Sequence, residues 1–175
     1  AKKPLLHWDM MTFDPRVSAI HQASYRILKN LNSWSALRPE FYTPLREMQV
    51  WDHLGGGAIH FNCAEVGVAE LGFIVENREI VRALWQQLQQ CEKIDFSIEN
   101  TPIGIAKTTA NISLTLSDQS IHSAKLIVGA DGRQSWVREQ MSAELIERSY
   151  QQHAIIAVVQ ITEPHRFTAY QNFSV

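Results

Sequence analysis

Residues 125–138, with the sequence KLIVGADGRQSWVR, give the strongest local indication of the fold class. The apolar run at residues 125–128 does not alternate with polar residues, which is typical of a strand covered on both faces. The run ends in the glycine-containing turn at residues 129–132, and the positions at about 135–141 predict a short helix. A strand, a glycine turn and a helix in this order indicate an α/β element whose turn can approach a ligand closely.

The turn itself offers specific groups to a ligand. Gly129 and Gly132 let the backbone come close to a bound group, and the start of the following helix carries free N–H donors. Asp131 can accept hydrogen bonds from a ribose or ribityl hydroxyl. An ordinary strand-to-helix turn is the competing interpretation, because Asp-Gly is common turn chemistry. The spacing alone leaves both interpretations open.

The rest of the chain predicts a mixture of strands and helices, and therefore an α/β or α+β fold class. Apolar spacing predicts helices at about residues 20–32 and 77–90, the second with Asn77 as its N-cap. A hairpin is expected across the glycines at residues 55–57. Strands are expected at residues 45–52, 59–63, 71–75, 94–98, 112–116, 150–161 and 167–173, with a turn at residues 118–119 before Ile121.

Composition excludes several function classes. The chain has 175 residues, of which 45% are hydrophobic and 19% charged, so it can bury a core. Sixteen basic residues against 18 acidic ones give a formal charge of −2, without the basic excess expected of a nucleic-acid binder. We expect no membrane-spanning segment and no signal peptide. Cys63 and Cys91 lack a CxxC spacing and predict free thiols in a reducing compartment.

Short motifs narrow the chemistry further. The eight glycines build neither a G-x-G-x-x-G fingerprint nor a P-loop. The seven histidines form no H-x-x-x-H pattern, so no metal site is expected, and no G-x-S-x-G or local carboxylate pair identifies a catalytic side chain. Arg16 stands in an extended segment, where an arginine can reach a phosphate with two hydrogen bonds. From that position alone, a surface arginine is the simpler interpretation.

Three stretches occur together in an order that resembles one family. They are residues 14–20 (DPRVSAI), residues 72–85 (GFIVENREIVRALW) and residues 125–138. The chain resembles the FAD-dependent aromatic hydroxylases related to p-hydroxybenzoate hydroxylase, and most of all the ubiquinone-biosynthesis hydroxylases. The resemblance covers nearly all of residues 14–175. It implies part of a two-domain flavin monooxygenase fold, an internal fragment without the first Rossmann βαβ unit and the C-terminal part.

The resemblance also implies roles for individual residues. Arg16 matches an arginine that contacts the phosphate side of FAD. Asn77 matches a polar position that hydrogen-bonds the flavin cofactor, where many relatives carry arginine or glutamine. The turn at residues 129–132 matches an Asp-Gly motif associated with both FAD and NAD(P)H. Arg138 matches the arginine that closes this motif and is often linked to the pyridine nucleotide.

The two domains of such enzymes divide the chain into four segments. Residues 14–37 and 77–149 would be part of the FAD-binding domain. Residues 38–76 and 150–175 would be part of a substrate-binding domain that is mainly β. Without the first βαβ unit a sheet edge stays open, so a homodimer through exposed sheet edges is an option.

The activity implied by the resemblance is hydroxylation of the aromatic ring of a polyprenyl phenol or quinol in ubiquinone biosynthesis. NAD(P)H would reduce FAD, and O2 would form a C4a-hydroperoxyflavin that transfers oxygen to the ring. The resemblance suggests a cytoplasmic protein with peripheral contact at the inner membrane and with a ubiquinone-biosynthesis complex. We expect the chain alone to be inactive. Two alternatives stay open: a hydroxylase of a soluble aromatic compound, and a non-catalytic interaction module in a biosynthetic complex.

Overall fold

The computed structural model describes residues 3–9 and 11–174, which form two compact units. The larger unit contains Pro4–Asp95 together with the segment that starts at Ile155. The smaller unit contains Phe96–Ala154 and Lys3. These units are defined by packing alone, so the assignment of segments to FAD-binding and substrate-binding domains stays a prediction.

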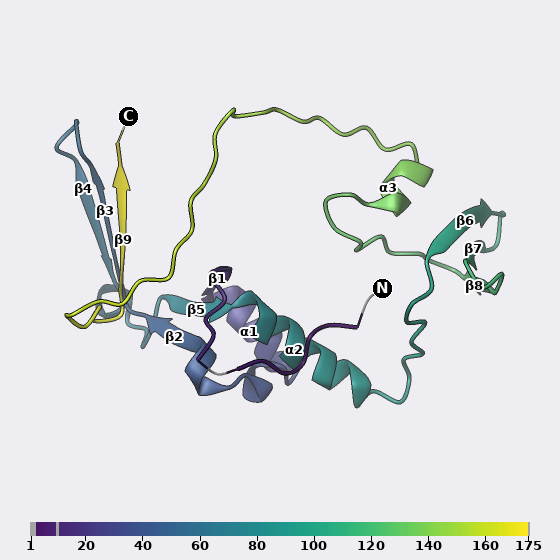
Figure 1. Ribbon diagram of the computed structural model, residues 1–175, viewed down its shortest axis with the longest axis horizontal. Coiled ribbons are helices and arrows are strands. Elements are labelled where there is room, and N and C mark those ends of the chain that lie inside the picture. The colour runs from purple at the N-terminus through teal and green to yellow at the C-terminus, as the bar shows by residue number, and fades with distance from the viewer. Residues whose placement is uncertain (1–2, 10, 175) are drawn as a thin grey trace. The chain divides into compact units, whose positions relative to one another are not determined.

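The first sheet of the larger unit is antiparallel and has three strands in the order β1 (Val17–His21), β5 (Gly72–Glu76) and β2 (Tyr42–Leu45) (Figure 1). Strands β1 and β5 each lead directly into a helix, because the apolar period changes from two to 3.6 along the chain. Helix α1 (Gln22–Asn30) follows β1, and helix α2 (Asn77–Gln89) follows the central strand β5. The end of β5 therefore delivers the chain directly into α2.

The core of this unit lies where α2 meets the first sheet. Leu37, Val75 and Ala83 are its buried apolar residues, and Val75 and Ala83 are fully buried. Four aromatic rings, of Tyr25, Trp34, Tyr42 and Phe73, pack against one another with centroid distances of 4.6 to 6.0 Å. The short 3₁₀ helix η1 (Trp34–Ala36) places Trp34 and Ala36 against this core, and a second 3₁₀ helix, η2 (Pro39–Phe41), leads into β2.

The second sheet has the strand order β4 (Ala58–Asn62), β3 (Glu47–Asp52) and β9 (Thr168–Phe173) (Figure 1). Strands β3 and β4 pair antiparallel, which confirms the predicted hairpin across residues 55–57. Strand β9 pairs parallel with β3 although it lies far along the chain. The 3₁₀ helix η3 (Cys63–Val66) follows β4 and buries the Cys63 thiol; Cys63 and the exposed Cys91 are both free.

The smaller unit is an antiparallel meander of β6 (Pro102–Lys107), β7 (Ile112–Leu116) and β8 (Ile121–Ala124). The turn predicted at residues 118–119 is confirmed, and the amide of Gln119 donates to the carbonyl of Leu116 over 2.9 Å. The predicted short helix is also confirmed as α3 (Trp136–Gln140). No helix formed by the described residues has the length and apolar character that a membrane span requires.

Three predicted strands, at residues 94–98, 125–128 and 150–161, are absent from the structure. A strand is stable only when its backbone groups pair with a neighbour. The described part of the chain supplies no neighbouring strand to any of the three. Leu126 and Val128, predicted to be covered, are 73% and 74% exposed. Whether the apolar run at residues 125–128 forms a strand therefore depends on a pairing partner and not on the local sequence.

Two further predictions about the larger unit are wrong in detail. Asn77 is the first helical residue of α2, and Glu76 takes the N-cap position. The reason is that the Asn77 side chain is engaged by Ser18 across the strand pair and does not fold back on its own helix. Trp51, whose spacing in the strand predicted at residues 45–52 indicates a packed core side chain, is 36% exposed on the second sheet and packs edge-on against Tyr170.

Candidate functional site

The structure brings Arg16 and Asn77 together at one end of the β1–β5 pair. Val17 lies opposite Glu76 in the antiparallel register, so the residue before β1 and the residue after β5 are neighbours. The backbone N–H of Asn77 donates to the carbonyl of Arg16 over 3.0 Å. Two residues 61 positions apart in the printed sequence therefore lie side by side at one end of the first sheet.

Both side chains present donors at this edge. The Arg16 side chain is 75% exposed, and its Nε lies 3.6 Å from the carboxylate of Asp14. The amide oxygen of Asn77 accepts from the Ser18 hydroxyl over 2.5 Å, which fixes the orientation of the amide. The Asn77 NH2 group has no hydrogen-bond partner among the described residues. A guanidinium and an oriented amide donor suit phosphate and carbonyl oxygens.

A buried carboxylate, Glu79, anchors the first turn of α2. Glu79 is fully buried, and its two oxygens accept bonds from the backbone N–H of Arg38 and from the Arg38 and Arg82 guanidinium groups, at 2.6 to 3.1 Å. Arg82 also donates to the carbonyl of Ala36. This network, which we call the Glu79 cluster, ties α2 to the segment at residues 36–38. It holds the helix end that carries Asn77.

The Glu79 cluster has a clear electrostatic balance. Burial alone raises the pKa of Glu79, but the hydrogen bonds from Arg82 and Arg38 outweigh it, so the pKa lies below its ordinary value. The hydrogen bond between Arg82 and Glu79 also raises the pKa of Arg82. The Arg38 guanidinium also lies 4.3 Å from the ring centroids of Trp8 and of Phe41.

The sequence predicts the helix at residues 77–90, which contains Glu79, but does not predict the Glu79 cluster. Only the spacing of Glu79 and Arg82, three residues apart on one helix face, signals a pair. The contact with Arg38 spans 41 positions and has no local pattern.

In the smaller unit, the turn at residues 129–132 lies against α3. A Cβ atom at Gly129 would be 2.8 Å from the Cβ of Val137, so glycine is required for this close packing. Gly132 has φ +87°, a conformation that favours glycine. The glycine spacing of the motif thus has a structural cause in each position, one steric and one conformational.

The Asp131 carboxylate organises the start of α3. One oxygen accepts from the Ser135 hydroxyl over 2.5 Å, and the other from the Val137 amide over 3.2 Å. The hydrogen bond from Ser135, with that from Val137, lowers the pKa of Asp131. Each oxygen has capacity for a further donor such as a sugar hydroxyl. Arg138, predicted to close the motif, donates to the carbonyl of Arg133 over 2.5 Å.

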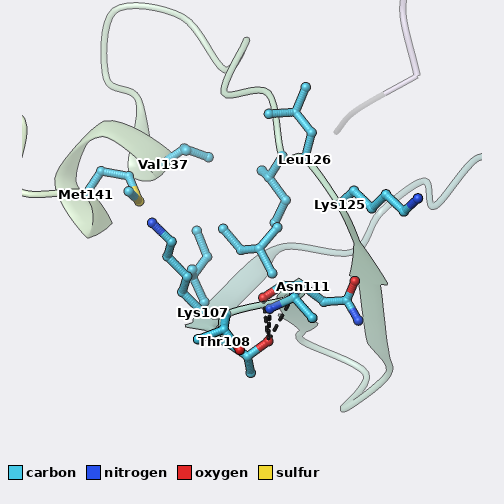
Figure 2. A pocket seen from close by; sticks show the side chains of 12 residues that line it. Lys107, Thr108, Asn111, Lys125, Leu126, Val137 and Met141 are labelled. Carbon is cyan, nitrogen blue, oxygen red and sulfur yellow. Dashed lines mark hydrogen bonds between the residues drawn. The ribbon is translucent and has the colours of Figure 1, made fainter.

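A pocket of about 350 Å³ lies beside this motif within the smaller unit (Figure 2). Val137 of α3 and Met141, the C-cap residue of this helix, form one wall, and Leu126 lines the pocket from the apolar run at residues 125–128. The Lys107 side chain reaches from β6 toward α3. The exposed apolar run therefore lines a hollow in place of the predicted covered strand. Among the described residues, no three His, Cys, Asp or Glu side chains gather to hold a metal ion.

Replacing Ser135 by alanine is expected to destabilise the start of α3. The Ser135 side chain caps α3 by accepting from the Arg138 amide over 3.1 Å, and it also donates to Asp131. Loss of a serine cap costs about 1 kcal/mol. Hydrogen exchange at the Arg138 amide should accelerate about fivefold. Replacing Ser123, an exposed serine on β8, should leave this exchange rate unchanged, and an unchanged rate in Ser135→Ala would contradict the capping role.

The fold resembles that of solved flavin enzymes. The chain superposes with a TM-score of 0.64 on pqsL, a probable FAD-dependent monooxygenase from Pseudomonas aeruginosa, at 20% identity. The match covers 77% of this chain and 38% of that one. The fold class is therefore that of part of an FAD-dependent monooxygenase, as predicted. No protein-family model matches the chain.

Sequence relatives narrow the class. The chain is 30% identical over 161 residues to 3-demethoxyubiquinol 3-hydroxylase of Escherichia coli (strain K12), covering 92% of this chain and 41% of the relative. It is also 30% identical over 161 residues to ubiquinone biosynthesis monooxygenase COQ6, mitochondrial, of Homo sapiens, covering 87% of this chain and 34% of the relative.

The resemblance predicted from the three motifs is thereby confirmed. Over most of its length the chain is similar to ubiquinone-biosynthesis monooxygenases. It spans about two fifths or less of the length of these relatives.

Proposed function

We propose that this chain is part of an FAD-dependent monooxygenase that hydroxylates the aromatic ring of a polyprenyl phenol or quinol in ubiquinone biosynthesis, with NAD(P)H and O2 as co-substrates. The observation that carries the proposal is the similarity to 3-demethoxyubiquinol 3-hydroxylase across 92% of the chain. The fold shared with a probable FAD-dependent monooxygenase supports the same conclusion. When bound, the cofactor supplies the redox and oxygen chemistry that side chains lack.

The residues of the chain fit a flavin cofactor in both units. In the larger unit, the exposed Arg16 guanidinium and the oriented Asn77 amide can bind a phosphate and a polar edge of the cofactor. In the smaller unit, the backbone at Gly132 is open, and Asp131 has acceptor capacity for ribose or ribityl hydroxyls. We assign Arg138 to the pyridine nucleotide. Binding and orientation are the tasks of these side chains.

The domain assignment belongs to the same proposal. Residues 14–37 and 77–149 contribute to the FAD-binding domain, and residues 38–76 and 150–175 to the substrate-binding domain. The polyprenyl tail of such a substrate is strongly apolar and partitions into the membrane. The aromatic ring of the substrate is therefore most accessible to an enzyme at the membrane surface. We therefore propose peripheral contact with the cytoplasmic side of the inner membrane and with partner proteins of the pathway. The outer strands β4 and β9 of the second sheet supply edges for a homodimer.

Replacing Arg16 by alanine is expected to weaken FAD binding to this chain about tenfold, because one charge-assisted contact with phosphate is lost. Quenching of flavin fluorescence during titration measures the affinity. Arg26, on α1, provides a matched control, and Arg26→Ala should bind FAD like the unchanged chain. Equal affinities for both variants would remove Arg16 from the cofactor site.

A further inference from the structure

The second sheet has two faces of different chemistry. Strand pairing places residues in three rows across β4, β3 and β9: Asn62–Glu47–Thr168, His60–Gln49–Tyr170 and Ala58–Trp51–Asn172. Residues paired across neighbouring strands point to the same side of a sheet. Contacts of Glu47 with His60, and of Trp51 with Tyr170, agree with this grouping. We call these nine residues the polar–aromatic face.

The opposite face is mainly apolar. Its paired residues include Met48 with Phe61 and Val50 with Ile59, and it also carries Gln171 of β9 beside Val50. An ordinary exposed face of a sheet carries charged and small polar residues. The polar–aromatic face instead combines two large aromatic rings with amide, imidazole and carboxylate groups, which is the composition of small-molecule binding sites.

Three side chains on this face form a connected group. Nε2 of His60 lies 3.2 Å from one carboxylate oxygen of Glu47, and the side-chain amide of Asn62 donates to the other over 3.4 Å. Since a carboxylate only accepts, Nε2 of His60 is the donor in this contact, and in the neutral tautomer that carries this proton Nδ1 is an acceptor. Nδ1 of His60 has no hydrogen-bond partner among the described residues. His60 pairs with Gln49 on β3, and Gln49 pairs in turn with Tyr170 on β9.

A groove lies next to this group on the same hairpin. It measures about 360 Å³ and is lined by Gln49, Trp51, Ala58 and His60 of the polar–aromatic face and by Val50 and Ile59 of the opposite face. The Trp51 and Tyr170 ring centroids are 6.5 Å apart in an edge-to-face arrangement. Trp51 is 36% exposed, so part of its surface is available to another ring.

We propose that this groove binds a phenolic ring, with the ring against Trp51 and its hydroxyl donating to Nδ1 of His60. This inference rests on the proposed function, since it assigns His60 to the phenol or quinol substrate. In the step assigned to His60, the phenolic O–H bond breaks and an N–H bond forms at Nδ1. The electron pair stays on the phenolate oxygen, and Glu47 stabilises the imidazolium through Nε2. A phenolate ring is richer in electrons and is hydroxylated more readily.

The test compares two small ligands that differ in one hydrogen-bond donor. The 175-residue chain is titrated with 2-methoxyphenol and with 1,2-dimethoxybenzene, and the shift of the Trp51 indole N–H signal is followed by NMR. We expect about fivefold tighter binding of the phenol, the worth of one hydrogen bond. In His60→Phe, which keeps a ring but removes the acceptor, the two ligands should bind equally.

Matched variants separate a specific effect from a general one. His122, on β8 of the smaller unit, serves as the control, and His122→Phe should keep the fivefold preference. If His60→Phe loses the native amide spectrum, Glu47→Gln takes its place, because it keeps the imidazole but removes the negative charge that stabilises the imidazolium at Nε2. Its preference should fall to less than half. Equal binding of both ligands to the unchanged chain overturns the inference, as does a preference that survives in His60→Phe or is undiminished in Glu47→Gln.

FAD titration distinguishes this inference from the proposed function. FAD binding without a preference for the phenol refutes the role of His60 alone. A phenol preference without FAD binding refutes the cofactor assignment and leaves the phenol groove standing.

Discussion

Replacing Glu79 by glutamine is expected to lower the free energy of unfolding by about 3 kcal/mol, because it removes the only anion of a buried ion-pair cluster and leaves its arginines uncompensated. The Glu79 carboxylate is fully buried and receives both Arg38 and Arg82. Denaturant unfolding followed by circular dichroism measures the change. Glu65, an exposed carboxylate on η3, gives the control, and Glu65→Gln should change stability by less than about 0.5 kcal/mol. Similar effects for both variants would show that the Glu79 cluster does not hold the fold.

The same cluster predicts a dependence on pH. The pKa of Glu79 is lowered in the folded chain, so the unfolded chain binds the proton more tightly. Its contribution to stability is complete above the ordinary glutamate pKa of about 4.3 and is lost as the pH falls through the lower folded value. In Glu79→Gln this part of the acid destabilisation should disappear, and stability should change less between neutral and acidic pH.

Replacing Gly72 by alanine is expected to cost about 2 to 3 kcal/mol, the second large effect. The new Cβ would overlap the backbone carbonyl oxygen of Ile20 on the paired strand, and backbone atoms cannot rotate away. Thermal unfolding should show a lower midpoint. Gly57, in the hairpin turn, has open space around a Cβ and an ordinary φ, so Gly57→Ala should be close to neutral. A neutral Gly72→Ala would contradict the close approach of β1 and β5.

The local elements of the fold could be predicted from the sequence where a single segment determines its own structure. Apolar spacing at 3.6 residues located α2, and alternation around residues 55–57 located the hairpin of β3 and β4. The strand predicted at residues 125–128 is wrong, because a covered strand needs a pairing partner that local sequence does not supply. The parallel pairing of β9 with β3 is likewise a property of the assembled unit.

The candidate site was partly predictable for the same physical reason. Phosphate and sugar binding need particular residue types, namely glycine, aspartate and arginine. Because these occur in the motif at residues 129–132 and at Arg16, the sequence alone predicts both. The meeting of Arg16 with Asn77 depends on the register of β1 and β5, which only the structure gives. The link from Glu79 to Arg38 depends on how the 36–38 segment folds over α2. The sequence shows charges, and the fold decides which of them meet.

Equilibrium titration of the 175-residue chain with FAD, followed by flavin fluorescence and difference absorbance, tests the claim that these residues carry a usable part of a flavin site. We expect saturable binding of one FAD per chain with a dissociation constant in the micromolar range. This corresponds to a binding free energy on the order of −8 kcal/mol. Spectra that stay those of free FAD up to millimolar chain would contradict the claim.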